Sequence, residues 1–256
     1  QRLLESVTPV RNSASRTSTN GVLSYEQLLN REPRWAMSEG SRHFEEKSAV
    51  FQAIHNIAQR LKSLEIPYAV VGGMALFRHG VRRFTEDVDI LVTKADLQVI
   101  HEKLEGFGYL PPFSNSKNLR DTQYGVKIEF FTTGDYPGDG KQKPVSFPDP
   151  RNVSFESDGI SYINLPVLVE LKLASGMTNP GRLKDLSDVL ELIRVLALPL
   201  TFAEQLAPFV QSKFNELWQD VVDSEKYAAA DETENWKSAG SDKQESKPTD
   251  LPPTKE

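Results

Sequence analysis

The sequence predicts an α/β (α+β) protein, with a small mixed sheet flanked by helices and a C-terminal helical portion. Short apolar runs bounded by glycine, proline and aspartate alternate with helical patterns over residues 45–165. Helical patterns without strands fill residues 166–222. With 256 residues, 38% of them hydrophobic, the chain is long enough to bury one core and to carry a helical annex.

Polar segments flank these two parts. Residues 1–44 are predicted to be a partly disordered leader, and residues 1–20 are rich in serine and threonine, as transit peptides and ordinary leaders both are. Residues 223–256 contain nine acids and five lysines and are predicted to form a disordered acidic tail. The tail carries most of the net charge of −6. The folded part is therefore nearly neutral and lacks the broad basic surface of a non-specific nucleic-acid binder.

The core should begin with a helix over about 45–64, where apolar residues recur at helical spacing. A strand starts at Pro67 and ends at Gly72-Gly73, and a short helix then runs to His79. The segment 87–92, Asp-Val-Asp-Ile-Leu-Val, is apolar and mostly β-branched apart from its two acids. It is predicted to be a buried strand.

The remaining elements follow from apolar spacing and from turn-forming residues. We expect a helix over 94–107, a strand over 125–131, a surface loop over 135–150 and two short strands over 153–163. We expect further helices over 166–175, 183–196 and 202–222, with a break at 176–181.

Two carboxylates on the predicted strand 87–92 indicate a cation site. Side chains two residues apart on a strand share a face, so Asp87 and Asp89 project together. Two neighbouring carboxylates in an apolar setting repel each other and lose hydration unless a cation compensates. The Gly72-Gly73 turn opens a helix, and backbone N–H groups at a helix start bind phosphate well.

Together these residues resemble the DNA polymerase beta-type nucleotidyltransferase superfamily, and they are most similar to its minimal bacterial members, which include toxins of abortive-infection systems. The resemblance extends over about 51–217 and rests on the following segments. They are Gly72-Gly73-Met74-Ala75-Leu76, Arg83-Phe84-Thr85-Glu86-Asp87-Val88-Asp89, Lys172, and Arg182-Leu183-Lys184-Asp185-Leu186-Ser187-Asp188.

The resemblance implies a metal-dependent transfer of a nucleoside monophosphate. Asp87, Asp89 and a third acid, Glu129, would bind Mg²⁺ or Mn²⁺, and Glu129 would also accept the proton of the attacking hydroxyl. Lys172 would contact the phosphates of the nucleoside triphosphate. Glutamate is less usual than aspartate at the third position, and Lys127 should point to the same face and could neutralise it.

Further residues are predicted to hold the nucleotide or to orient the groups that do. They are Gly72, Gly73, Arg83, Thr85, Arg182, Asp185 and Asp188. Simpler roles remain open for several residues. Glu129 could be a surface acid on an edge strand, Lys172 could be paired with Asp185 or Asp188, and Arg83 and Thr85 could only brace a turn. His79 is expected to be structural.

Composition excludes several other chemistries. The sequence has no cysteine, so disulfides, thiolate metal sites and a cysteine nucleophile are excluded. The four histidines lack close metal-ligand spacing, which favours oxygen ligands and hence magnesium. No apolar run approaches the roughly 20 residues of a membrane span. We expect a soluble, cytoplasmic protein that has no membrane partner.

The leading hypothesis is a nucleotidyltransferase that moves a nucleoside monophosphate to a hydroxyl on RNA, a protein or a small molecule and releases pyrophosphate. Two alternatives remain. One is a nucleotide-binding or regulatory module with weak catalysis. The other is an interaction protein of the toxin–antitoxin kind, whose acidic tail docks a protein partner.

Overall fold

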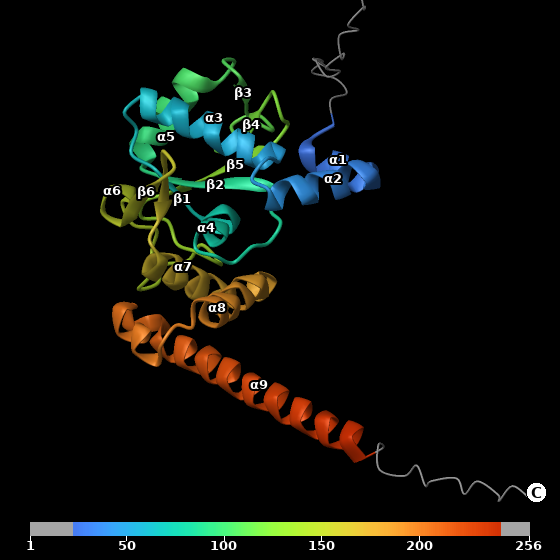
Figure 1. Ribbon diagram of the computed structural model, residues 1–256. Coiled ribbons are helices and arrows are strands. Elements are labelled where there is room, and N and C mark those ends of the chain that lie inside the picture. The colour runs from blue at the N-terminus through green and yellow to red at the C-terminus, as the bar shows by residue number, and fades with distance from the viewer. Residues whose placement is uncertain (1–22, 242–256) are drawn as a thin grey trace, which may run out of the picture.

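A seven-stranded mixed sheet with helices on both faces forms the centre of the molecule (Figure 1). The computed structural model describes the backbone of residues 23–241 and the side chains of residues 23–227. The strand order is β3-β4-β5-β2-β1-β7-β6. The strands are β1 (Ala69–Val70), β2 (Asp87–Val92), β3 (Tyr109–Leu110), β4 (Leu119–Asp121), β5 (Lys127–Thr132), β6 (Ser154–Ser157) and β7 (Ile160–Ile163). The predicted α/β class with a mixed sheet is confirmed.

The helices are unequal in length and fall into groups before, within and after the sheet. The first six α-helices are α1 (Tyr25–Arg31), α2 (Pro33–Phe44), α3 (Ala49–Ser63), α4 (Gly72–Arg78), α5 (Lys94–Leu104) and α6 (Pro150–Val153). After the last strand come α7 (Leu165–Thr178), α8 (Leu183–Leu196) and α9 (Pro208–Ser241), with the short 3₁₀ helices η1 (Pro180–Arg182) and η2 (Leu200–Gln205) between them.

Strand β2 shows how the sheet separates an apolar face from a functional one. It pairs with β5 in parallel and with β1 antiparallel. Its even-numbered residues Val88, Ile90 and Val92 are buried in the apolar core that also contains α3. Asp87 and Asp89 alternate with them and therefore point to the opposite face. On that face a second apolar core contains residues of α7, α8 and α9.

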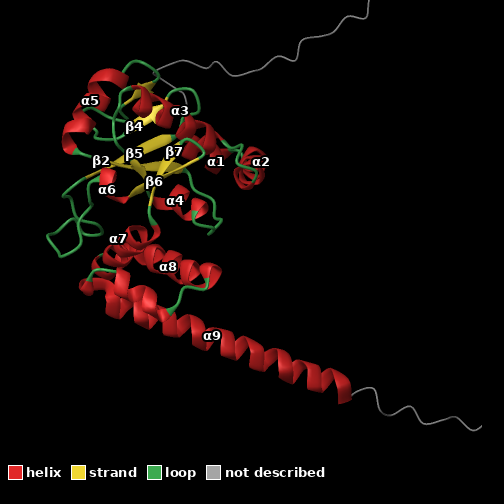
Figure 2. Ribbon diagram, turned by 60° about the vertical axis from the view of Figure 1, so that its left-hand side comes forward, coloured by secondary structure: helices red, strands yellow, loops and turns green. Residues whose placement is uncertain are grey.

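The C-terminal helices form a layer beneath the sheet (Figure 2). Helices α7, α8 and α9 contact one another, and α9 then extends away from the rest of the molecule. The prediction that the tail is disordered from residue 223 is wrong as far as Ser241, because α9 continues to that residue. Between Pro208 and Gly240 the helix contains no glycine or proline, and Lys226 forms an ion pair with Asp223 at 3.0 Å. Residues 242–256 lie outside the described part.

The predicted leader also contains structure. Residues 23–44 form α1 and α2, and Ser24 caps α1 by accepting a hydrogen bond from the backbone of Gln27. Tyr25 is fully buried and donates its hydroxyl proton to Glu39 at 3.3 Å. This part of the leader therefore belongs to the core, while residues 1–22 lie outside the described part. Hydrophobic periodicity misses it because so few of its residues are apolar.

Smaller differences concern the element ends. Helix α7 does not break at Gly176, where a Cβ atom would lie 2.5 Å from Leu186, so this glycine permits close packing of α7 on α8. The helix expected over 202–222 is divided, because η2 precedes Pro208 and α9 follows it. The short strands β3, at the edge of the sheet, and β4, next to it, were not predicted. Within the described residues, no helix has the length and apolarity that a membrane crossing requires.

Candidate active site

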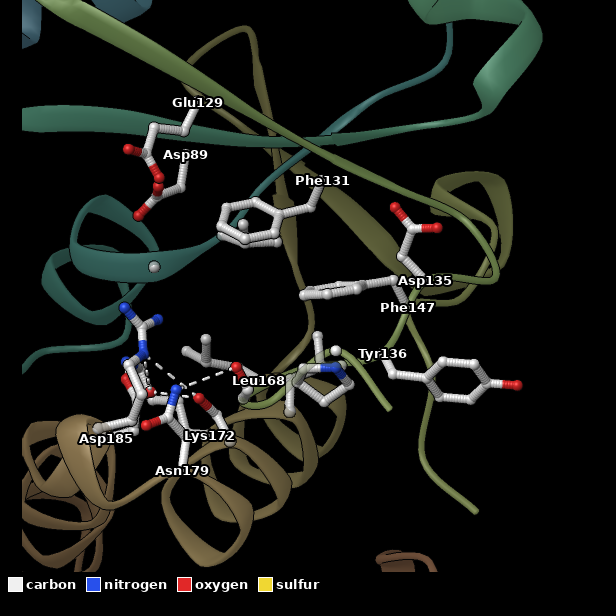
Figure 3. A pocket seen from close by; sticks show the side chains of 18 of the residues that line it. Asp89, Glu129, Phe131, Asp135, Tyr136, Phe147, Leu168, Lys172, Asn179 and Asp185 are labelled. Carbon is white, nitrogen blue, oxygen red and sulfur yellow. Dashed lines mark hydrogen bonds and ion pairs between the residues drawn. The ribbon is translucent and has the colours of Figure 1, made fainter. Parts of the chain in front are cut away.

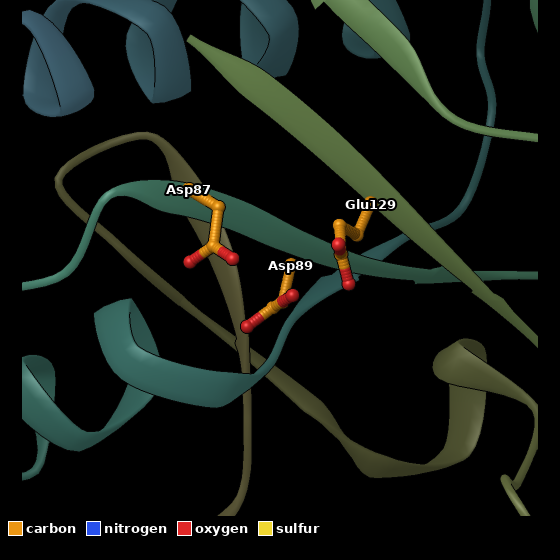
Figure 4. Close-up of side chains that lie close together, drawn as sticks. All are labelled: Asp87, Asp89 and Glu129. Atoms are coloured by element: carbon orange, nitrogen blue, oxygen red, sulfur yellow. The ribbon is translucent and has the colours of Figure 1, made fainter. Parts of the chain in front are cut away.

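Three carboxylates converge where β2 and β5 lie side by side (Figure 4). The parallel register places Asp89 opposite Glu129, and Asp87 lies two residues earlier on the same face of β2. One carboxylate oxygen from each of Asp87, Asp89 and Glu129 lies within 4.8 Å of the others. We call these three residues the carboxylate cluster. A strand spacing of two and one sheet register are enough to assemble it.

The carboxylate cluster has little positive charge of its own. Its one ion pair within the described residues joins Glu129 to Lys127, which lies two residues earlier on β5. Burial, followed by repulsion from Asp87 and Glu129, raises the pKa of Asp89 to about 8. The more distant cations Lys172 and Arg182 offset this only in part. Such a site gains from any cation that binds it.

Two glycines let the backbone approach the carboxylate cluster. Gly72 has φ +60°, and a Cβ atom there would lie 1.8 Å from Asp89 Oδ2. A Cβ atom on Gly73 would lie 2.7 Å from Thr85 Oγ1. Any larger residue would displace the carboxylate or the hydroxyl. The Gly72-Gly73 pair is therefore required by close contact and, at Gly72, also by backbone conformation.

Thr85 orients the first acid. Its buried hydroxyl donates a hydrogen bond to Asp87 Oδ1 at 2.9 Å. The same side chain packs on Gly73, so it connects the strand with the start of α4. Thr85 was predicted to hold the nucleotide or to brace the turn, and in this structure it makes the bracing contact.

A second group of charges lies on α7, α8 and the segment before β2, and we call it the helix charge network. Its members are Arg83, Lys172, Arg182, Asp185 and Asp188. Lys172 Nζ contacts Asp185 Oδ1 at 3.0 Å and Asp188 Oδ2 at 2.7 Å. Both aspartates lie on one face of α8 because they are three residues apart. The predicted pairing of Lys172 with these acids is what the structure shows.

The arginines complete this network. Arg83 Nη2 donates to Asp188 Oδ2 at 3.1 Å, and its Nε lies 3.0 Å from Oδ1 without hydrogen-bond alignment. Arg182 Nε donates to Asp185 Oδ2 at 3.0 Å, and Ser175 donates to the same oxygen at 2.7 Å. Burial alone would raise the pKa of Asp185, but Lys172, Ser175 and Arg182 outweigh it and hold that pKa below its ordinary value. Each acid therefore has several donors.

The two groups face each other across a cleft of about 780 Å³ (Figure 3). Asp89, Glu129 and Gly72 line the sheet side, and Lys172, Arg182 and Asp185 line the helix side. The cleft continues along β5 to an apolar part. Phe131 and Phe147 lie there with their ring centroids 5.0 Å apart.

The structure brings all the residues singled out by the sequence to this cleft or to its immediate supports. Sequence reasoning missed Phe131, Phe147, Lys117, Ser175 and Asn179, which also line the cleft. Phe131 could have been found, because it follows Glu129 by two residues on the same strand. Phe147 lies in a loop, where no periodicity identifies it.

The carboxylate cluster has the donor set of a divalent-metal site. It offers oxygen atoms only, which suits a hard cation such as Mg²⁺ or Mn²⁺. Gly72 packs directly against the Asp89 carboxylate, and both residues line the cleft.

Comparison with known proteins gives neither a matching family model nor a matching curated protein. Several solved structures are similar in part. The antibiotic-resistance factor ANT(2″)-Ia, solved in complex with adenylyl-2″-tobramycin, is 11% identical, with 66% of this chain and 96% of that chain covered and a TM-score of 0.41. An antigenic nucleotidyltransferase-like protein from Paracoccidioides brasiliensis is 16% identical, with 56% and 74% covered and a TM-score of 0.37. JHP933 from Helicobacter pylori is 14% identical, with 77% and 98% covered and a TM-score of 0.38. With identities and TM-scores this low, function has to be argued from the site itself.

Proposed function

We propose that this protein is a metal-dependent nucleotidyltransferase, which moves a nucleoside monophosphate from a nucleoside triphosphate to a hydroxyl and releases pyrophosphate. One observation carries the proposal. The carboxylate cluster has an excess of negative charge, and it faces a cleft whose opposite wall carries Lys172 and Arg182. A cation bound by the acids and a polyphosphate bound between the two walls would neutralise both sides.

The chain's own residues supply specific parts of the reaction. The acceptor oxygen forms a bond to the α-phosphorus, while the bond from that phosphorus to the bridging oxygen of pyrophosphate breaks. The hydroxyl proton passes to the carboxylate of Glu129. When bound by the carboxylate cluster, Mg²⁺ or Mn²⁺ supplies positive charge to the phosphate oxygens. Placement of the reacting atoms then accounts for much of the rate gain.

The phosphates have two sets of contacts available. Gly72 lines the cleft at the start of α4 and presents only backbone to it, so a phosphate can approach the main chain there. Lys172 and Arg182 line the other wall of the cleft. Asp185 holds both cations in place. We assign Lys172 to the phosphates and Asp185 and Asp188 to the positioning of Lys172.

Within the superfamily, the contact of Lys172 with Asp185 is what the resemblance to the toxin-type enzymes leads us to expect. This contact supports our proposal that the protein is similar to that branch. The acceptor class stays open among RNA, protein and small molecules, as does a protein partner for the acidic tail.

One observation favours a second candidate, a nucleotide-binding module with weak catalysis. Glu129 forms an ion pair with Lys127, so its carboxylate is already held by a cation and is less free to contact the acceptor hydroxyl. In that case the metal and the nucleotide would still bind, but transfer would be slow.

The test is transfer of α-labelled ATP, CTP, GTP and UTP, with magnesium or manganese, to RNA, protein and metabolite fractions of a cell extract. The Asp87→Asn/Asp89→Asn variant should lose the label, whereas the matched variant Asp158→Asn should keep it, because Asp158 is an exposed turn residue outside the cleft. Label in one fraction would identify the acceptor class. Metal-dependent nucleotide binding without transfer would favour the second candidate, and label transfer by the double variant would refute the proposed site.

A further inference from the structure

We infer that the base of the donor nucleotide lies against Phe131 and Phe147, at the apolar end of the cleft, and that the site prefers purines through stacking. This inference rests on the proposed function. It assigns a specificity role to two residues that the metal site does not use. Three features of the cleft support it: the order of residues along β5, the fixed loop behind Phe147 and the state of the nearby polar groups.

Along the cleft face of β5, the side chains change from charged to apolar within two residues, from Glu129 to Phe131. Lys127, Glu129 and Phe131 alternate with buried Ile128 and Phe130 and so share one face of β5, of which Glu129 and Phe131 line the cleft. Two residues along a strand cover about 6.6 Å. In a nucleotide, one ribose separates the α-phosphate from the base. Because Lys127 does not line the cleft and Phe131 does, an α-phosphate at Glu129 brings the base to Phe131.

The neighbouring strand repeats this change. In the β2–β5 register, Asp89 lies opposite Glu129, and Leu91 lies opposite Phe131. Leu91 is fully buried in the second core. The sheet beneath the cleft is thus acidic in one row and apolar in the next, and Phe131 is the member of the apolar row that lines the cleft. A ligand that matches it must carry charge at one end and an apolar surface next to it.

The loop that carries Phe147 is held in position. Phe147 exchanges backbone hydrogen bonds with the start of the loop, from its N to Asp135 O at 2.8 Å and from Gly134 N to its own O at 2.8 Å. Further along, Asn179 Nδ2 donates to Gly138 O at 3.2 Å. Gly138 sits so close to α7 that a Cβ atom would lie 2.4 Å from Thr178 Oγ1. The two rings, 5.0 Å apart and inclined at 33°, therefore form a prepared wall.

Most polar side chains near this wall already have partners. Asp135 accepts hydrogen bonds from Thr132 and pairs with Lys94 at 3.2 Å. Asn179 donates to Gly138 and accepts from Gly181 N at 2.9 Å. Lys117 also lines the cleft, with its Nζ 5.7 Å from the centroid of the Phe131 ring, and a single flexible cation there cannot read the full hydrogen-bonding edge of a base. Selection should therefore depend on stacking, which every base permits and which a larger ring system strengthens.

The experiment is a calorimetric titration of the full chain, in magnesium, with ATP, GTP, CTP, UTP and inorganic tripolyphosphate. Wild-type protein should bind ATP and GTP more tightly than CTP, UTP or tripolyphosphate. The Phe131→Leu variant keeps an apolar side chain, and it should weaken ATP binding about 5- to 150-fold, as the loss of one base–aromatic stack would. Its affinity for tripolyphosphate should not change. Phe131→Tyr should restore ATP binding, and Phe113→Leu, at an exposed phenylalanine outside the cleft, should have no effect.

Failure of this inference can be told apart from failure of the proposed function. If wild-type protein binds tripolyphosphate as tightly as ATP, the base has no site of its own, and the inference is wrong while the proposed function stands. Unchanged ATP affinity in a folded Phe131→Leu variant leads to the same conclusion. If neither ATP nor tripolyphosphate binds, the proposed function is wrong and the inference falls with it. The wild-type comparison needs no variant and so does not depend on how Phe131→Leu folds.

Discussion

The carboxylate cluster and the helix charge network face the same cleft but differ in how their acids are compensated. The cluster contains three carboxylates and has one lysine as its ion-pair partner within the described residues. The network contains two carboxylates and three cations, and each acid contacts at least two of the cations. The cluster therefore opposes folding unless a cation binds, whereas the network is satisfied by its own members.

The difference follows from the elements that carry the two groups. Strands β2 and β5 place acids side by side through their register. The side chains on this face of the sheet all point the same way, so neighbouring strands cannot supply a cation that faces the acids from across the cleft. Helices α7 and α8 pack against each other, so a lysine on one meets acids three residues apart on the other. Acids left uncompensated in a cleft are available for a ligand. Acids that are fully paired position their partners.

The largest expected effect comes from breaking the helix charge network. Lys172→Met should lower the free energy of unfolding by about 3–5 kcal/mol, because it leaves buried acids without their main partner. The matched change Lys127→Met in the carboxylate cluster should cost far less, since Lys127 is partly exposed. Urea unfolding measures both. Equal losses in the two variants would mean that the groups do not differ as described.

Metal should stabilise the protein only through the carboxylate cluster. At a concentration 100 times its dissociation constant, Mg²⁺ or Mn²⁺ should raise the free energy of unfolding by about 2.7 kcal/mol. The Asp87→Asn/Asp89→Asn variant should lose this gain, and Asp185→Asn, in the network, should keep it if it folds. Thermal unfolding with and without metal is the measurement. Metal stabilisation that survives in the double variant would place the metal elsewhere.

Gly72→Ala tests how tightly the backbone packs against the carboxylate cluster. It forces a left-handed conformation on alanine and places a Cβ atom 1.8 Å from Asp89 Oδ2. Gly159→Ala is the control, because Gly159 also has positive φ, +78°, but open space around its Cβ position. Gly72→Ala should cost about 1–3 kcal/mol more than the control, which is the overpacking contribution. Similar costs for both variants would show that Asp89 moves freely.

The smallest expected effect is a pH dependence that belongs to the metal-free cluster. The pKa of Asp89 is raised to about 8 in the folded protein, against about 3.9 in an unfolded chain. Below about pH 4 this carboxyl group is protonated in both states, and the folded protein has its full stability. As the pH rises through about 8, Asp89 ionises in the folded protein, and this part of the stability is lost. Between pH 5 and 8.5, wild-type protein should therefore lose at least about 1.4 kcal/mol relative to Asp89→Asn. Parallel pH profiles of the two proteins would contradict this.

Much of the fold could be predicted from local patterns. Helices α3, α5 and α8 and strands β2, β5, β6 and β7 lie where apolar spacing places them, within a few residues. The short strands β3 and β4 could not be found, because each has three residues or fewer and depends on pairing with its neighbours. Helices α1 and α2 were missed because they are mainly polar, and α9 was cut short because a charged composition is common to disordered tails and exposed helices.

The candidate site divides in the same way. The shared face of Asp87 and Asp89 and that of Asp185 and Asp188 follow from the periods of a strand and a helix, so the sequence alone determined them. Only the tertiary structure decided that Glu129 joins Asp87 and Asp89, because this contact depends on strand register. It also decided that Arg83 joins Asp188, which lies 105 residues away along the chain. Only packing likewise placed Phe147 opposite Phe131. Periodicity acts within one element, whereas the partners of a charge or a ring are chosen by whichever elements pack together.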